Sequence, residues 1–281
     1  MAGVKALPDG LDERDIRLSL AEHWDFVADT VEYFPEGFGS YHWIAPDADG
    51  ARRFVTVDDL DTKSWLGNTR DAAFEGLHTA FDVASTLRHR AKLSFVVAPL
   101  QTRDEQTLVR LDERHTISAY PIAPGASGDF GDRPTSHQRR RIIEMLVDLH
   151  RATPLVRSTA SQCDLSIPGR DVLTDTISDL SRSWDSGPYA KPARAALTHG
   201  RPAILRLFPV FDVLADGLAA DDDLVITHVE PHLGNVMRDG ARSRLSTGTP
   251  SALPSPNATS GSSTASPTTN SQRTPRPPVD R

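Results

Sequence analysis

The sequence has little of what marks secreted, membrane-spanning or nucleic-acid-binding proteins. Its 281 residues include a single cysteine, Cys163, which excludes an internal disulfide framework and suits a reducing cytoplasm. No apolar run approaches the length of a membrane span, and residues 1–15 lack the apolar core of a signal peptide. The formal net charge is -7, and no stripe of Lys or Arg is visible. We therefore expect a cytoplasmic protein with no membrane partner and no nucleic-acid partner.

The last part of the chain is poor in large apolar residues. Residues 243–281 contain 9 Ser, 7 Thr and 7 Pro, and their large aliphatic residues are Leu245, Leu253 and Val279. Such a composition cannot bury enough apolar surface to offset the entropy of ordering the chain. We expect residues 241–281 to form a disordered tail.

The stretch from Val225 to Val236 contains the groups that a phosphoryl-transfer site needs. A short apolar segment, predicted to be a strand, is followed by His228, by Glu230 two residues later, and by Asn235 five residues after Glu230. In such a site a carboxylate takes the proton of the attacking hydroxyl, an amide oxygen binds magnesium, and a rigid loop fixes their separation.

This spacing resembles the catalytic loop of the aminoglycoside phosphotransferase family, kinase-fold enzymes that phosphorylate small-molecule hydroxyls. The family pattern is His-Gly-Asp, four residues and Asn, whereas here Val229 takes the Gly position and Glu230 the Asp position. Glu keeps the carboxylate, but Val resists the positive φ that a tight turn often requires. The resemblance implies that Glu230 is the base or hydroxyl-orienting group, His228 a loop-shaping residue, and Asn235 a magnesium ligand.

Two other interpretations of the same segment stay open at this point. His228 and Glu230 also match the His-x-Glu of zinc deaminases, but those enzymes carry a later pair of cysteines, and Cys163 lies upstream without a partner. The segment is also compatible with a strand end that bears two ordinary surface histidines.

A glycine turn lies upstream, where a kinase fold requires one. Residues 31–44 predict a strand, a turn containing Gly37, Gly39 and Ser40, and a second strand. Glycines let the backbone approach a phosphate, and main-chain amides together with the Ser40 hydroxyl can cover it. The resemblance implies that these three residues cover the phosphates of ATP.

The next predicted strand, residues 52–57, follows the turn signal Asp49-Gly50. In a kinase small lobe this strand carries the lysine that pairs with the phosphates, but here Thr56 stands at that place. Lys63, in the following loop, is the nearest cation. We interpret it as a solvated loop lysine in preference to one that reaches inward.

The remaining pattern is one helix and three short strands, followed by three helices. The first helix is expected from the N-cap Asn68 to Leu87, and the connector at Pro121–Gly125 lies where a kinase fold offers main-chain groups to an adenine. The resemblance therefore places Tyr120 and Ile122 in the nucleotide site. The other segments are strands at 95–98, 107–111 and 116–120 and helices at 142–149, 173–184 and 204–214, the last kinked at Pro209.

Asn235–Arg238 predicts a strand and Asp239-Gly240 a hairpin turn, but no returning apolar strand is evident. In a reading frame that joins the last base of each codon to the first two of the next, Thr247-Gly248-Thr249 permits Asp-Trp-Asp. This resembles the second metal-binding motif of the family. We hypothesise that the chain is truncated or frameshifted after about residue 240, leaving its ancestral frame between Asp239 and Ser246.

The expected architecture is an α+β, two-lobed protein-kinase-like fold with an incomplete C-terminal lobe and a disordered tail. Residues 1–120 form the β-rich nucleotide-binding lobe, 121–240 the helical lobe and 241–281 the tail. The resemblance implies ATP and Mg²⁺ as cofactors and a small-molecule hydroxyl as substrate, with transfer impaired in this chain. The alternatives are a non-catalytic remnant that binds nucleotide at most, and a small-molecule-binding module that never used ATP.

Overall fold

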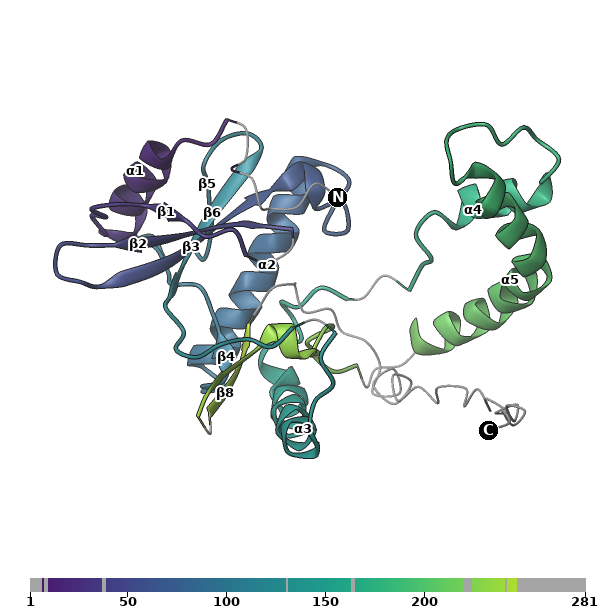
Figure 1. Ribbon diagram of the computed structural model, residues 1–281. Helices are drawn as coiled ribbons and strands as arrows, with labels where there is room; N and C mark the ends of the chain where they lie inside the picture. Colours follow the sequence, from purple (N-terminus) through teal and green to yellow (C-terminus); the bar gives the residue numbers. More distant parts are fainter. Residues whose placement is uncertain are drawn as a thin grey trace, which may run out of the picture.

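The computed structural model describes residue 7 and residues 10–36, 39–129, 131–162, 165–219, 224–240 and 242–246. Cys163, Gly37 and the residues after Ser246 lie outside these ranges, so the expectations for them are untested. Figure 1 shows a twisted sheet with one helix on each side, a small second sheet below it, and a pair of helices that stands apart.

The larger sheet is antiparallel and holds the predicted glycine-turn hairpin. Its strand order is β1-β2-β3-β6-β5, and Glu32 pairs with Ile44 across the first hairpin. The strands are β1 (Glu32–Tyr33), β2 (Tyr41–Pro46), β3 (Arg52–Asp59), β5 (Val109–Arg110) and β6 (His115–Pro121). The hairpin between β2 and β3 forms as the sequence predicts, with Gly50 at a φ of +81° in its turn.

One face of this sheet is apolar and is covered by a helix that the sequence analysis missed. Helix α1 (Glu13–Trp24) begins at the N-cap Asp12, whose side chain accepts a hydrogen bond from the Arg14 amide. It buries Ile16 and Leu20 against the sheet, where the core includes Trp43, Val55, Val57, Ile117 and Ala119. Only two large apolar residues of α1 are fully buried, so its periodic signal is weak.

The opposite face of the sheet is polar although it is buried. Strand alternation places Thr56, Asp58 and Ser118 on this face, and all three are nearly inaccessible to solvent. Helix α2 (Arg70–His89) packs on this side, with Phe81 edge-on to Tyr120. Its N-cap is Thr69, whose hydroxyl accepts from the amide of Ala72, so the predicted N-cap Asn68 was one residue too early.

The second sheet contains the returning strand that the sequence analysis did not find. Its order is β4-β8-β7, made of β4 (Val96–Val97), β7 (Val236–Asp239) and β8 (Arg242–Ser246). β8 pairs antiparallel with β7 and parallel with β4. Leu245, 1% exposed, packs in one core cluster with Val96 and Val236. The predicted start of the tail at residue 241 was therefore wrong, because residues 242–246 form a strand. The composition of this segment gave no sign of a strand, since Leu245 is the one side chain that it buries.

The helical part follows the predicted order with shifted boundaries. Helix α3 (Ser136–Arg151) has a full capping box between Thr135 and Gln138, and the short helix η2 (Thr153–Leu155) follows it. α4 (Arg170–Ser178) ends before the predicted Leu180 and Trp184, whereas α5 (Ala190–Ala219) is longer than its predicted stripe and contains Pro202 and Pro209.

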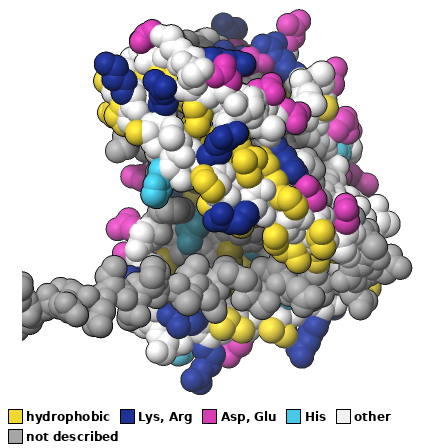
Figure 2. Space-filling model, turned by 90° about the vertical axis from the view of Figure 1, so that its right-hand side faces the viewer, with side chains coloured by type: hydrophobic (Ala, Val, Ile, Leu, Met, Phe, Trp, Pro, Cys, Tyr) yellow, Lys and Arg dark blue, Asp and Glu magenta, His cyan; other side chains and the backbone are white. Residues whose placement is uncertain are grey.

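Helices α4 and α5 pack on each other and leave much of their apolar surface uncovered. Arg170 forms an ion pair with Asp212 and lies over the ring of Phe208. The exposed large hydrophobic residues of α5 are Leu205, Leu207, Val210, Val213 and Leu214. Figure 2, which views the molecule from the α4–α5 side, shows hydrophobic side chains gathered in one area. Within the described ranges, no helix has both the length and the apolar character needed to cross a membrane.

Candidate functional site

The loop that precedes β7 is held from one side by the end of α3. The amide of Ile226 donates to the hydroxyl of Thr153 at 3.0 Å, and that hydroxyl donates to the carbonyl of His150 at 2.6 Å. The Arg157 guanidinium donates to the carbonyl of Leu224 at 3.0 Å. Residues 224–228 are therefore an irregular segment, and the strand predicted there does not form, because a side chain satisfies its buried amide in place of a neighbouring strand.

Asn235 is locked in one orientation. Its side-chain Nδ2 donates to the main-chain carbonyl of Glu230 at 3.0 Å and lies 3.2 Å from Nε2 of His232. A carbonyl can only accept, so the NH₂ end of the amide must face into the loop. The amide oxygen is then the end of Asn235 that is free to bind a ligand.

His228 ties the same loop to the end of β8. Its Nε2 lies 2.7 Å from the carbonyl of Ser246, and because a carbonyl only accepts, Nε2 carries the proton. Nδ1 of His228 is buried and has no hydrogen-bond partner in the described part of the chain. The contact places the C-terminal end of β8 beside the loop that carries Glu230 and Asn235.

Val229 and Glu230 are both exposed. Among the described residues, positive φ outside glycine occurs at Asp25, Lys92 and Glu105, so Val229 has a negative φ. The departure from the family's Gly thus costs no backbone strain, since a β-branched residue accepts this conformation. The exposed Glu230 side chain leaves its carboxylate accessible to a substrate.

The connector after β6 clamps this loop, a role that the sequence analysis did not assign to it. Gly125 has a φ of +111°, and a Cβ there would lie 2.2 Å from the carbonyl oxygen of Arg238. Ala126 and Arg238 exchange two main-chain hydrogen bonds, and the amide of Gly128 donates to the carbonyl of Leu233 at 3.0 Å. The Pro124-Gly125 pair was the available signal, because glycine after a turn often marks close backbone approach.

The glycine turn rests on a buried lysine. Nζ of Lys63 lies 2.7 Å from Oδ1 of Asp58, and it donates to the carbonyl of Gly39 at 2.6 Å and to Oγ of Ser40 at 3.1 Å. Ser40 in turn donates to Asp58 at 2.5 Å. The side chains of Lys63 and Asp58 are 6% and 4% exposed. The interpretation of Lys63 as a solvated loop lysine is therefore wrong, since the loop after β3 turns it inward.

Thr56, at the place of the expected strand lysine, takes part in a neutral contact. Its hydroxyl lies 3.1 Å from Nδ1 of His42, and the His42 ring packs on Phe54 with centroids 4.9 Å apart. Burial lowers the pKa of His42 to about 4; the nearby Asp58 works in the opposite direction, and Lys63 adds to the lowering. His42 is thus neutral at pH 7, and the positive charge at this end of the sheet comes from Lys63.

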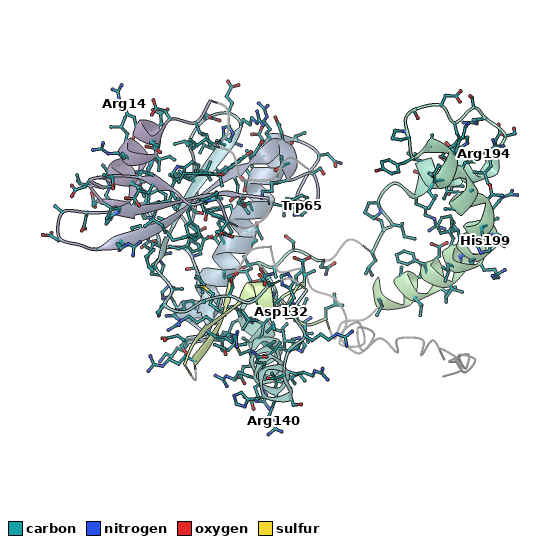
Figure 3. The ribbon with its side chains drawn as sticks, in the orientation of Figure 1. Arg14, Trp65, Asp132, Arg140, Arg194 and His199 are labelled. Carbon is teal, nitrogen blue, oxygen red and sulfur yellow. The ribbon has the colours of Figure 1, made fainter. Side chains whose placement is uncertain are left out.

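The two residues expected near an adenine differ in exposure. Tyr120 is buried at 7% exposure, and Ile122 is 36% exposed just after β6 ends. Figure 3 labels Trp65, whose ring centroid lies 5.5 Å from Nζ of Lys63 beneath the glycine turn, and Asp132, whose carboxylate accepts from the Asp129 amide in the connector.

The geometry disfavours the zinc interpretation. Nε2 of His228 donates to a carbonyl, and Nε2 of His232 faces the amide of Asn235, so these two Nε2 atoms are not presented as ligands. Among the described residues, no three His, Cys, Asp or Glu side chains gather in a way that could hold a metal ion.

The chain resembles solved structures in its fold. No family model and no curated protein matches it. Spectinomycin phosphotransferase APH(9)-Ia bound to ADP and spectinomycin superposes with a TM-score of 0.63 at 17% identity, over 87% of this chain and 71% of the other. Its AMP-bound complex gives 0.61 at 15% identity, over 87% and 72%. The chain has the fold of a phosphotransferase. At these identities the likeness establishes the α+β, kinase-like fold that the sequence predicted.

Proposed function

We propose that this chain is a phosphotransferase of the aminoglycoside phosphotransferase type, which binds ATP and Mg²⁺ in the cytoplasm and acts on a small-molecule hydroxyl. The observation that carries the proposal is the fixed orientation of the Asn235 amide, which leaves its oxygen able to bind a metal. The exposed Glu230 lies in the same loop. The solved relative with this fold was captured with ADP and spectinomycin, which supports a nucleotide and a small molecule as ligands.

We propose the following roles for the site residues. Glu230 orients the attacking hydroxyl and takes its proton, while His228 fixes the loop against β8. Gly39 and Ser40, together with Gly37, cover the phosphates, and Tyr120 and Ile122 face the adenine. Residues 1–120 then form the nucleotide-binding lobe and residues 121–240 the helical lobe.

The donor set of the loop suits Mg²⁺, which prefers oxygen ligands and binds through one or two protein groups plus phosphates. Asn235 Oδ1 would hold the ion, which when bound neutralises charge on the transferring phosphoryl group. The ligand that we assign to the metal, Asn235, is neutral. We therefore propose that transfer by this chain is slow, since electrostatic stabilisation carries most of the catalysis in such enzymes.

A melting experiment with nucleotide tests binding separately from turnover. We expect Mg²⁺-ATP to raise the melting temperature of this chain, and Asn235→Ala to remove the magnesium dependence of that shift. Glu75→Gln, on the exposed side of α2, is the matched control and should behave as the parent.

The turnover assay measures ADP release with spectinomycin and other polyhydroxylated amines as acceptors. This chain should release ADP slowly, at a rate above that of Glu230→Gln. Binding without turnover would favour the alternative of a nucleotide-binding remnant. No ligand shift with any nucleotide would overturn the proposal and leave a small-molecule-binding module.

A further inference from the structure

The cluster beneath the glycine turn contains a buried charge pair that stability alone does not explain. Lys63 and Asp58 lie almost fully out of solvent, 2.7 Å apart. Desolvating two charges offsets most of their attraction, and an apolar pair of similar volume stabilises a fold as well or better. A buried lysine at a turn that faces a proposed phosphate site therefore calls for a role in binding.

The contacts of the ammonium are of two kinds. An ammonium has three N–H donors, and here they meet the Asp58 carboxylate, the Gly39 carbonyl and the Ser40 hydroxyl. The carboxylate is charged, whereas the other two acceptors are neutral. A phosphate oxygen is a stronger acceptor for a cation than a carbonyl or a hydroxyl, so it can replace a neutral partner while the Asp58 pair stays intact.

Around this cluster, we assign the role of binding a phosphate oxygen to Lys63. Thr56, on the strand where a kinase fold carries its phosphate-pairing lysine, is neutral and occupied by His42. Lys63 lies seven residues further along the chain, in the loop after β3, and its Nζ reaches the turn from there. The Cβ of a residue at Gly39 would stand 3.8 Å from Nζ, so the ammonium sits directly under the backbone that would approach a phosphate.

We propose that Lys63 is the cation that contacts the nucleotide phosphates, displaced from the strand to the following loop, and that Asp58 positions it. This rests on the proposed function, because it assumes that the turn faces a nucleotide. Lys63 then contributes to binding of the phosphate chain and nothing to binding of the adenosine part.

The test compares ATP, ADP and adenosine binding to the full chain by calorimetry. Lys63→Gln removes the charge but keeps N–H donors for Gly39 and Ser40, and Lys63→Arg keeps the charge. Lys191→Gln, an exposed lysine on α5, is the matched control for net charge. The parent should bind ATP more tightly than adenosine.

For Lys63→Gln we expect the affinity for ATP to fall about 10- to 100-fold, the range of one charge-assisted hydrogen bond, with adenosine binding unchanged. Lys63→Arg should keep most of the preference for ATP, and Lys191→Gln all of it. An equal preference for ATP in Lys63→Gln and the parent would overturn the proposal, as would failure of both Lys63 variants to fold. If the parent binds none of the three ligands, the proposed function itself fails.

Discussion

The side-chain amide of Asn235 donates to the main-chain carbonyl of Glu230, not to its carboxylate, at 3.0 Å. The loop geometry is therefore independent of the acid that it presents. Substitution of the Glu230 side chain should therefore change phosphoryl transfer but not stability, whereas substitution of Asn235 should change stability.

Glu230→Gln should leave the free energy of unfolding within about 0.5 kcal/mol of the parent, because the side chain is exposed and its carbonyl is retained. Any phosphoryl transfer that the parent shows should disappear. Urea unfolding and ADP release measure the two effects on the same preparation. A variant with full transfer would show that Glu230 is not the acid of the site.

Asn235→Ala should cost about 1 kcal/mol of stability, since it leaves the Glu230 carbonyl without this donor. Asn235→Asp should cost at least as much, because a carboxylate cannot donate to a carbonyl and repels it. Chemical denaturation gives both values. An Asp variant as stable as the parent would mean that the amide is not oriented as described.

Gly125→Ala should destabilise the protein by roughly 2–4 kcal/mol, because a Cβ would meet the Arg238 carbonyl at 2.2 Å on a backbone with positive φ. The control is Gly217→Ala in α5, where a Cβ meets nothing within 4 Å. Helix propensity predicts that the control is neutral or gains up to about 1 kcal/mol. Equal behaviour of the two variants would refute the clamp at the connector.

Acid should destabilise the fold through His42. Its folded pKa is about 4, below the ordinary value of 6.5, so between these values the unfolded chain binds a proton that the native protein does not. Stability is then fully present above pH 6.5 and falls as the pH drops toward 4, by roughly 2–3 kcal/mol.

The comparison with His42→Asn isolates this effect. The variant should lose the part of the pH dependence that the parent shows between pH 4 and 6.5 in urea titrations. Burial also lowers the pKa of His150, so a residual slope of the same sign should remain. An unchanged slope in His42→Asn would contradict the buried, neutral state of His42.

Leu207→Gln and Leu214→Gln in α5 should change stability by no more than about 0.5 kcal/mol, because both side chains are more than half exposed. They should reduce binding of an apolar dye, since exposed apolar patches bind such dyes. Ile177→Ala, at 1% exposure in α4, is the contrast and should cost about 2–5 kcal/mol. Similar losses for all three would mean that the face of α5 is covered in solution.

The frame hypothesis makes a prediction about the gene. β8 is complete to Ser246, and His228 bonds to the carbonyl of that residue. Residues encoded next would therefore begin beside the loop of Glu230 and Asn235. In the shifted frame, the third bases of the Ser246, Thr247 and Gly248 codons each join the first two bases of the codon that follows. We expect the three codons formed in this way to encode Asp-Trp-Asp. Any other bases at these positions would end the hypothesis.

Local patterns in the sequence determined the parts of the fold that neighbours in the chain can specify. The Gly50 hairpin formed as expected, because turn geometry depends on a few adjacent residues. The spacing of Glu230 and Asn235 likewise brought the two into contact within one loop. The resemblance of this loop to the family's catalytic loop, together with the order of strands, connector and helices, indicated the kinase-like fold.

Tertiary structure decided whatever depends on partners distant in the chain. Lys63 turned inward because Asp58 and the Gly39 carbonyl were there to receive its charge. β8 formed because β4, far upstream, offered it a parallel partner and a place for Leu245. The segment before His228 did not form the predicted strand, because the amide of Ile226 donates to the hydroxyl of Thr153. No local periodicity encodes such contacts, since their free energy arises only when the rest of the fold brings the partners together.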